Sequence, residues 1–257
     1  MSNNPYESPD PVGQSLPRKP NSVARRLVTF LMVIGVVGIL IALLLPNVRS
    51  AREPARRAAC ASHLKNIALA LQAYESDYHA LPPAYTVDAK GKPLHSWRTL
   101  ILPYLEHKAL YDRIDLTKPW DDPVNKQAYE TRVPIYQCPS SRDPQNHTTY
   151  LAVVAPHGCF RPTEHRKFSD IKDDPGLTLM VVEVDEGHGV HWMSPTNAGE
   201  DLLLSPETFA KATHPGRVQA VCVDSSVIQL HSELKPETIR ALISIDGHDD
   251  AVAKEAN

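Results

Sequence analysis

The chain has 257 residues, a net charge of −3 and a sequence isoelectric point near 6.4. This length is that of one or two domains. The lack of a basic excess excludes a general nucleic-acid-binding protein, because phosphate contacts need a positively charged surface. The 23 prolines are scattered along the chain and indicate turns and irregular loops.

The first 22 residues, MSNNPYESPDPVGQSLPRKPNS, are polar and rich in proline. Such a composition cannot bury enough apolar surface to offset the entropy lost on ordering. We therefore expect residues 1–22 to be disordered.

Residues 27–45 contain no charged side chain, and Thr29 is the most polar residue among them. As a helix this block would be about 28 Å long, close to the ~30 Å hydrocarbon core of a bilayer. A secretory signal would have a shorter apolar region followed by a cleavage site of small residues. A buried helix of a soluble protein rarely runs so long without a polar face. We predict a transmembrane helix over residues 23–46, in contact with membrane lipid.

Basic residues flank the predicted span on both sides, so the positive-inside rule does not decide its orientation. They are Arg18, Lys19, Arg25 and Arg26 before it, and Arg49, Arg52, Arg56, Arg57 and Lys65 after it. The cysteines all lie in the long C-terminal part, and disulfides persist outside the cytoplasm. We predict a protein of the cell membrane with a cytoplasmic N-terminus and an extracytoplasmic C-terminal domain.

A second helical pattern covers residues 47–80 and ends at Leu81-Pro82-Pro83. Apolar side chains recur there at steps of three or four residues, which is the spacing of one helix face. They are Cys60, Leu64, Ile67, Leu71, Tyr74 and Tyr78. We expect this face to pack on the rest of the domain.

Residues 81–246 alternate short apolar runs with turns, which predicts an α+β head with a mostly antiparallel sheet. Helices are expected at residues 96–115, with Pro103 as a possible point of breakage, at residues 125–133 and at residues 236–246. Strands are expected at residues 135–138, 148–154, 177–184, 218–224 and 227–232, the last two as a hairpin. The tail, residues 247–257, is expected to fray.

Several stretches resemble the DUF1559 family, a large group of pilin-like membrane proteins common in planctomycetes. The longest runs from Gly38 to Ala84, GILIALLLPNVRSAREPARRAACASHLKNIALALQAYESDYHALPPA. Shorter ones follow in the family's order: SWRTLILPYLEHKALYDRID, PWDDPVNKQ, IYQCPS, TTYLAVVAP, LMVVEV and VCVDSSVIQLHS. The resemblance implies a pilin-like fold over residues 47–246, in which a long N-terminal helix packs on the sheet. It implies no established biochemical activity.

The prepilin-type signal typical of this family is degenerate in this chain. Family members usually carry Gly-Phe, then Thr, and a Glu a few residues into the apolar run. Aligned back from GILIALLLP, the Gly-Phe pair falls on Ala24-Arg25, the Thr on Arg26 and the Glu on Thr29. The Gly after which the signal is normally cleaved is therefore absent. The Glu that normally pairs with a charge on a neighbouring subunit is absent as well. We expect an uncleaved anchor.

The family's late Asp-Gly-Ser motif reads Asp224-Ser225-Ser226 in this chain. Glycine adopts a positive φ freely, whereas serine does so at a cost. The geometry of this hairpin turn is therefore expected to differ from that of the family.

The four cysteines allow two disulfides in three pairings. The resemblance implies a bond between Cys60 and Cys138, because the family also carries cysteine at both positions. A second bond between Cys159 and Cys222, at positions that the family does not share, is a further hypothesis.

No motif predicts a catalytic residue, a metal site or a cofactor. The best local histidine pair is His188 and His191 in DEGHGVHW, but a loop lacks the helix that would hold both rings on one ion. Cys138 with His147 or His157 could pair a nucleophile with a base, but no protease-type signature surrounds Cys138.

These observations predict a non-enzymatic, single-pass membrane protein with a structural or interaction role. One alternative is a pseudopilin subunit of a type II secretion or type IV pilus-like machine, with other pilin-like proteins or a secretion complex as partners. Another is a membrane-anchored enzyme or ligand-binding module, which would show a pocket with converging polar groups.

Overall fold

The computed structural model describes residues 22–50, 52–214, 217–248 and 250–254, without the side chains of residues 42–50, 52, 250 and 251. The chain divides into an N-terminal unit, residues 1–51, and a domain, residues 52–257. The disorder predicted for residues 1–22 lies outside the described residues, except that Ser22 begins the first helix.

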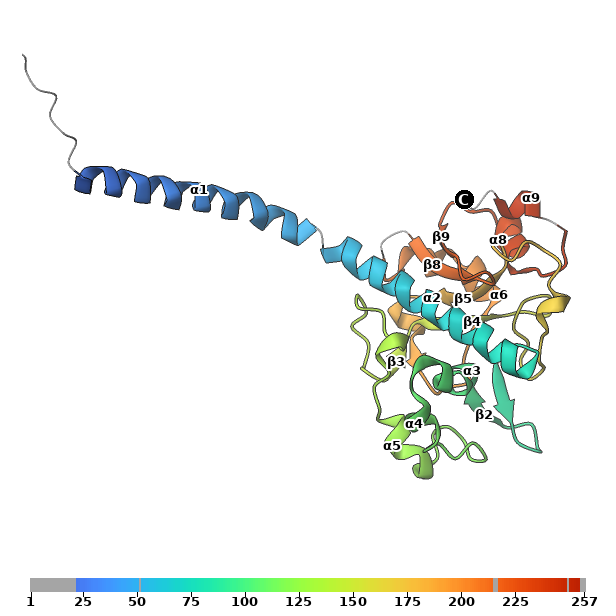
Figure 1. The fold of residues 1–257 in the computed structure, drawn as a ribbon. Helices are drawn as coiled ribbons and strands as arrows, with labels where there is room; N and C mark the ends of the chain where they lie inside the picture. The colour runs from blue at the N-terminus through green and yellow to red at the C-terminus, as the bar shows by residue number, and fades with distance from the viewer. Residues whose placement is uncertain (1–21, 51, 215–216, 249, 255–257) are drawn as a thin grey trace, which may run out of the picture. The chain divides into compact units, whose positions relative to one another are not determined.

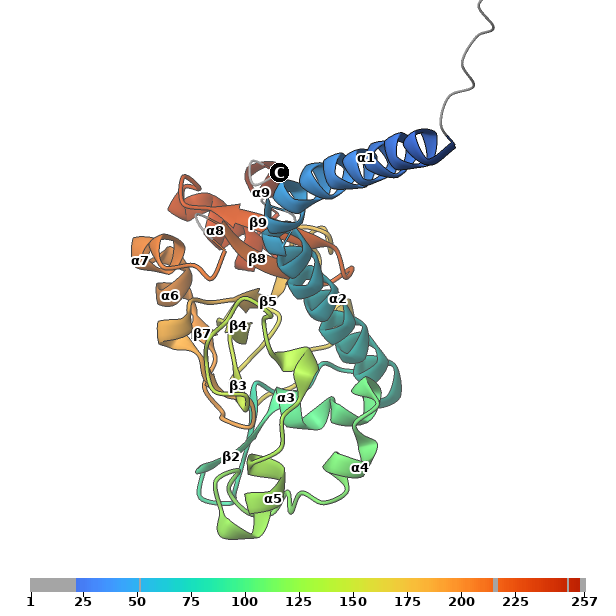
Figure 2. The same cartoon turned by 90° about the vertical axis from the view of Figure 1, so that its left-hand side faces the viewer.

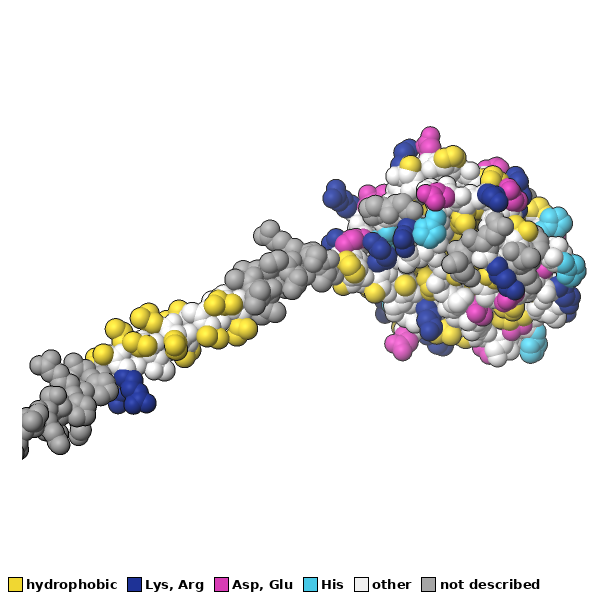
Figure 3. Space-filling view, turned by 90° about the horizontal axis from the view of Figure 1, so that it is seen from above, with side chains coloured by type: hydrophobic (Ala, Val, Ile, Leu, Met, Phe, Trp, Pro, Cys, Tyr) yellow, Lys and Arg dark blue, Asp and Glu magenta, His cyan; other side chains and the backbone are white. Residues whose placement is uncertain are grey.

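Helix α1 (Ser22–Ser50) contains the predicted span. Its segment Ser22–Ile41 is long and apolar enough to cross a membrane, with a mean hydropathy of 2.1, and none of it is buried. Large apolar side chains are exposed all along this segment, as Figure 3 shows in yellow. The single polar side chain of the apolar block, Thr29, is satisfied within the helix, because its hydroxyl donates to the carbonyl of Arg25 at 2.9 Å.

Helix α2 (Arg52–Tyr78) follows, and it carries the predicted apolar face. Five of the six residues of that face are buried: Cys60, Leu64, Ile67, Leu71 and Tyr74. The sixth, Tyr78, is 60% exposed at the end of the helix, where its ring stacks on Tyr74.

A five-stranded sheet in the order β7-β4-β5-β8-β9 forms the centre of the domain. The strands are β4 (Tyr150–Val154), β5 (Leu179–Glu183), β7 (Ala198–Gly199), β8 (Arg217–Cys222) and β9 (Val227–His231). All neighbours pair antiparallel except β4 and β7, which pair parallel. Two small antiparallel pairs flank it: β1 (Tyr85–Val87) with β2 (Pro93–Ser96), and β3 (His147–Thr148) with β6 (Val190–His191). The predicted α+β class is confirmed.

The sheet has helices on both faces (Figures 1 and 2). Helix α2 covers one face, and its buried residues share a core cluster with Tyr150, Val181 and Val221. The other face packs against α6 (Glu200–Leu204), α7 (Pro206–Ala210) and α8 (Pro236–Ile243). Because successive side chains in a strand point to opposite faces, β4, β5 and β8 each contribute buried residues to both clusters. The helix predicted at residues 236–246 is confirmed as α8.

Three predicted elements differ in the structure. The helix expected at residues 96–115 is broken by turns into α3 (Trp97–Leu100), η1 (Leu102–Leu105) and α4 (Lys108–Tyr111), with Pro103 in η1. The strand expected at residues 135–138 is a single 3₁₀ turn, η3 (Pro134–Tyr136), because Pro134 starts the turn with its fixed φ. The tail expected to fray forms α9 (Asp250–Ala253).

The remaining short helices connect these elements. They are η2 (Pro123–Asn125), α5 (Lys126–Tyr129), η4 (Phe168–Asp170) and η5 (Glu186–His188).

Arg98 of α3 fixes the backbone next to the sheet. Its side chain is fully buried, and its guanidinium donates to four carbonyl oxygens at 2.8–3.1 Å, those of Tyr150, Trp192, Ser194 and Thr196. Burial lowers the pKa of Arg98 to about 9. The planar fork of the guanidinium is what allows one side chain to satisfy several fixed acceptors.

The predicted hairpin of β8 and β9 is confirmed, and its turn has the left-handed geometry that glycine favours. Ser225 has φ = 70°. Its hydroxyl is buried and has no hydrogen-bond partner among the described residues. Ser225 therefore takes, at a cost, the left-handed conformation that glycine adopts freely. The expectation that this turn differs from that of the family stays a prediction.

We predict that Ser225→Gly stabilises the full-length protein by about 1 kcal/mol, because it relieves the left-handed strain and removes an unpartnered hydroxyl. The thermal midpoint of the detergent-purified protein measures this. The matched control is Ser226→Gly, which also removes a buried, unpartnered hydroxyl but at a position without positive φ, so it should stabilise the protein less than Ser225→Gly does. A lower midpoint for Ser225→Gly than for the wild type would contradict the assignment of strain.

Candidate functional site

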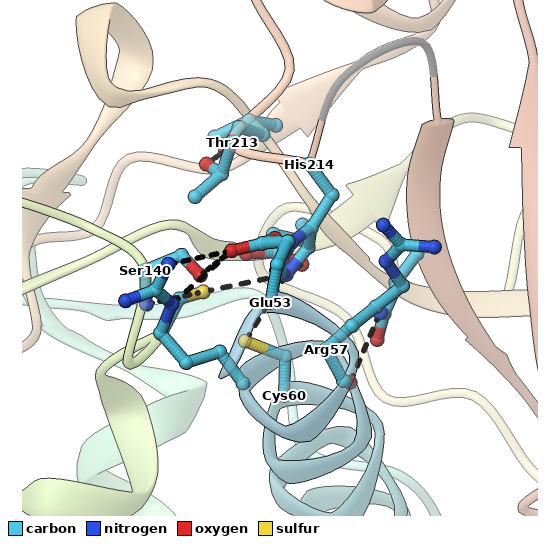
Figure 4. A network of polar contacts seen from close by, with 11 residues as sticks. Glu53, Arg57, Cys60, Ser140, Thr213 and His214 are labelled. Carbon is cyan, nitrogen blue, oxygen red and sulfur yellow. Dashed lines mark hydrogen bonds and ion pairs between the residues drawn. The ribbon is translucent and has the colours of Figure 1, made fainter. Parts of the chain in front are cut away.

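Four buried side chains from four separate segments of the domain converge beneath the first turns of α2. They are Cys60, Cys138, Glu183 and His214, and one ligand-type atom from each lies within 4.8 Å of all the others. Figure 4 shows His214 reaching from its loop between Glu53 and Cys60 on the helix. None of the other described residues forms such a group of histidine, cysteine and acidic side chains.

Local structure explains how each side chain arrives there. Cys60 belongs to the apolar face of α2, so helical periodicity turns it toward the sheet. Glu183 is the last residue of β5 and lies opposite Tyr150 of β4, on the face that α2 covers. His214 precedes β8, and the hydroxyl of its neighbour Thr213 donates to the carbonyl of Val184 at 3.3 Å. That bond holds the histidine loop at the end of β5.

Distances within the cluster centre on the Nε2 atom of His214. It lies 3.3 Å from the Sγ of Cys60, 3.7 Å from the Sγ of Cys138 and 3.7 Å from a carboxylate oxygen of Glu183. The ring therefore faces two sulfur atoms and one oxygen with a single nitrogen.

The opposite ring nitrogen of His214 has its own partner. Nδ1 lies 2.7 Å from a carboxylate oxygen of Glu53, in the first turn of α2. Glu53 is in turn paired with Arg56 at 2.9 Å, and the hydroxyl of Ser140 lies 3.5 Å from the same carboxylate. The backbone N–H of Ser140 donates to the Sγ of Cys138 at 3.4 Å. These contacts fix the orientation of the ring and of one thiol.

Glu183 is a buried acid without hydrogen-bond partners in the described structure. It is 3% exposed, and neither of its carboxylate oxygens has a hydrogen-bond partner among the described residues. Burial and the neighbouring Cys138 raise its pKa well above the ordinary value. The hydroxyl of Tyr150 across the strand is also buried and unpartnered, and burial together with Glu183 raises its pKa as well. The Nε2 of His214, 3.7 Å from a carboxylate oxygen of Glu183, is too far for a hydrogen bond. A buried acid without hydrogen-bond partners is costly, so this arrangement calls for a physical reason.

Three neighbouring titratable groups, Cys138, His214 and Glu53, have shifted pKa values as well. The Cys60 thiol and burial raise the pKa of Cys138 to about 12. Burial lowers the pKa of His214, but Cys138, Glu183 and Glu53 outweigh it and raise that pKa to about 9. The hydrogen bonds from His214 and Arg56 lower the pKa of Glu53. With no cation added, the charged pair is therefore His214 with Glu53.

The arrangement suits metal binding better than nucleophilic catalysis by a cysteine. A cysteine nucleophile needs a lowered pKa and an open approach, and Cys138 is 3% exposed with a raised pKa. The two thiols are near enough for an oxidised pair. Two sulfur atoms, one imidazole nitrogen and one carboxylate oxygen are also the ligand types that a transition-metal ion accepts.

The disulfides predicted from the sequence are not confirmed. All four cysteines are buried free thiols. Cys60 and Cys138 do come together, but in one cluster with a histidine and a carboxylate. Cys159 and Cys222 belong to different core clusters.

The histidines singled out in the sequence do not converge. His188 pairs with Asp185 at the domain surface. Both ring nitrogens of His191 are engaged, Nε2 with the carbonyl of Tyr129 at 2.9 Å and Nδ1 with the N–H of Met193 at 3.1 Å. The histidine beside Cys138 is His214, and neither His147 nor His157.

The sequence carries a signal for part of this cluster. Glu183 is the one charged residue in the apolar run LTLMVVEV, and alternation places it on the same face of the strand as Val181. Cys60 lies in the helical stripe. No local pattern marks His214, because its role depends on the pairing of β8 with the end of β5.

A polar cavity of about 550 Å³ lies elsewhere in the domain, lined by residues that include Arg161, Arg166, Lys172, Asp170 and Asp246. Burial lowers the pKa of Arg166. This cavity is the feature that keeps the ligand-binding alternative open.

Comparison with known proteins supports the resemblance seen in the motifs. The family model SBP_bac_10, described as "Protein of unknown function (DUF1559)", matches residues 49–154. The matched region includes Cys60 and Cys138 and ends before Glu183 and His214. No curated protein and no solved structure matches the chain.

We predict that Cys60 and Cys138 in the native full-length protein react with iodoacetamide at least about 100-fold more slowly than an exposed cysteine, because both are buried. A Lys90→Cys variant, at an exposed loop position, supplies the reference rate, and labelling in urea with a reductant should reach all four native thiols. Rapid native labelling of Cys138 would instead indicate an accessible nucleophile.

Proposed function

We propose that this member of the DUF1559 family, matched over residues 49–154, is a non-enzymatic, single-pass membrane protein with a pilin-like extracytoplasmic domain. Its role is structural or interaction-based. The observation that carries the proposal is the exposed apolar surface of α1, together with a domain built from a long helix on a mostly antiparallel sheet.

The surface of α1 is the strongest argument for the membrane. Thirteen large apolar side chains between Val23 and Ile41 are 47–75% exposed in the described structure. Exposed apolar area costs about 25 cal/mol per Å² in water, and a continuous apolar cylinder of this length matches a bilayer. The satisfied hydroxyl of Thr29 removes the one group that would be costly in lipid.

The charge pattern supports an anchor over a processed filament subunit. Arg25 and Arg26 stand where a prepilin-type signal would carry Phe and Thr, and Ala24 stands where the cleavage site would need Gly. Thr29 replaces the Glu, and it is occupied with its own helix backbone. The pseudopilin alternative shares the domain architecture, so processing of the N-terminus is what separates the two.

We predict that the full-length protein remains in the membrane pellet after alkaline carbonate extraction. Val33→Arg with Val37→Arg should release it, because each arginine at the centre of a span costs about 2.5 to 3.5 kcal/mol on insertion. Val33→Leu with Val37→Leu is the matched control and should stay in the pellet. Release of the wild-type protein by carbonate would overturn the anchor.

The same purified protein tests processing and sidedness. Its N-terminal sequence should begin upstream of Ala24, and a reporter fused after Asn257 should be active outside the cytoplasm. A mature N-terminus at Arg25 would favour the pseudopilin, and a reporter active only in the cytoplasm would reverse the proposed orientation.

A further inference from the structure

We propose that Cys60, Cys138, Glu183 and His214 bind one Zn²⁺ ion, and that this ion fastens the start of α2 to the sheet. The inference goes beyond the membrane-anchor proposal and does not depend on it, since all four ligands lie in the domain.

The geometry of the cluster fits a tetrahedral ion. Zinc bonds of about 2.3 Å to sulfur and about 2.0 to 2.2 Å to nitrogen and oxygen separate neighbouring ligand atoms by about 3.4 to 3.8 Å. The three separations from the Nε2 of His214 are 3.3, 3.7 and 3.7 Å, and all pairs lie within 4.8 Å. The three separations from His214 therefore match a tetrahedral site, and the other three pairs lie within 4.8 Å of one another.

The ligand types select zinc over the hard cations. Calcium and magnesium take oxygen ligands, whereas two thiolates with an imidazole favour zinc and related ions in tetrahedral geometry. On binding, each thiol releases its proton to solvent, and His214 and Glu183 bind in the deprotonated form. All four ligands are buried and come from the protein. A closed set of four protein ligands is typical of a structural zinc site.

Two observations besides the four ligand atoms support the ion. The Nδ1 of His214 faces Glu53 at 2.7 Å, and a carboxylate on the outer nitrogen of a histidine is the usual partner of a zinc-bound ring. The Glu183 carboxylate is 97% buried, with both oxygens unpartnered among the described residues. Its ion pair with His214 is long, at 3.7 Å, and zinc would bond a carboxylate oxygen of Glu183 directly.

The ion would join segments that are remote in sequence. Cys60 and His214 are 154 positions apart, and Cys138 and Glu183 come from two further segments between them. Because no such site exists in the unfolded chain, binding energy becomes folding energy. Loss of the ion should therefore loosen α2 from the sheet.

The test measures zinc in the full-length protein purified in detergent under reducing conditions, by elemental mass spectrometry after dialysis against zinc and then buffer. We expect about one zinc per chain in the wild type and well under about 0.2 in Cys138→Ser and Glu183→Gln. Cys159→Ala is the matched control, because it removes a buried thiol outside the cluster and should keep the full zinc content.

Thermal unfolding of Glu183→Gln also distinguishes a zinc ligand from a carboxyl group with a purely structural role. Without a metal, this substitution replaces a buried acid that has no hydrogen-bond partner with an uncharged amide of the same size, and it should leave the thermal midpoint unchanged or raise it. With zinc bound, it removes a ligand and should lower the midpoint of the zinc-loaded protein, while the midpoints of the two chelator-treated proteins should agree or favour the variant. Glu53→Gln, which keeps all four ligands, should weaken zinc affinity by about 10-fold to 100-fold.

Three results would overturn the proposal. One is a wild-type protein without zinc after reduction and reconstitution. Another is zinc that persists in both ligand variants. The third is a Cys60–Cys138 disulfide in protein isolated from the membrane with free thiols blocked at lysis, which mass spectrometry of the linked peptides would show.

Discussion

The buried carboxylate of Glu183 is the constraint on which the domain's organisation depends. It lies at the end of β5, under α2, where the surrounding strand residues are apolar and neither of its oxygens has a hydrogen-bond partner in the described structure. A fold does not keep such a group without compensation. Two thiols and an imidazole surround it, so one divalent cation accounts for all four side chains and for the convergence of their four segments.

The position of this cluster relates the domain to the chain that precedes it. Glu53 and Cys60 lie in the first turns of α2, within ten residues of the end of α1 in the sequence. Zinc at this point would hold α2 on β5 and β8 where a helix end would otherwise fray. Anchoring and cross-linking are separate inferences, yet together they describe a domain fixed close to its attachment point.

Much of the architecture could be predicted from sequence, because it rests on local periodicity. The apolar run of α1, the stripe of Cys60 to Tyr74 and the hairpin of β8 and β9 each follow from spacing alone. The strand predicted at residues 135–138 was wrong, because Pro134 starts a 3₁₀ turn there. The cluster itself could not be predicted from the sequence, because strand pairing between distant segments brings His214 to Cys60. The two cysteines shared with the family implied a disulfide, and the structure added the histidine and the carboxylate that change their chemistry.

The central claim is that two sulfur atoms and two lighter atoms surround a single ion. X-ray absorption at the zinc K-edge of the full-length protein measures this directly. The account predicts two sulfur ligands at about 2.3 Å and two nitrogen or oxygen ligands at about 2.0 to 2.2 Å, with the sulfur contribution reduced in Cys138→Ser. A spectrum with only nitrogen and oxygen ligands, or no zinc edge in reduced and reconstituted protein, would contradict it.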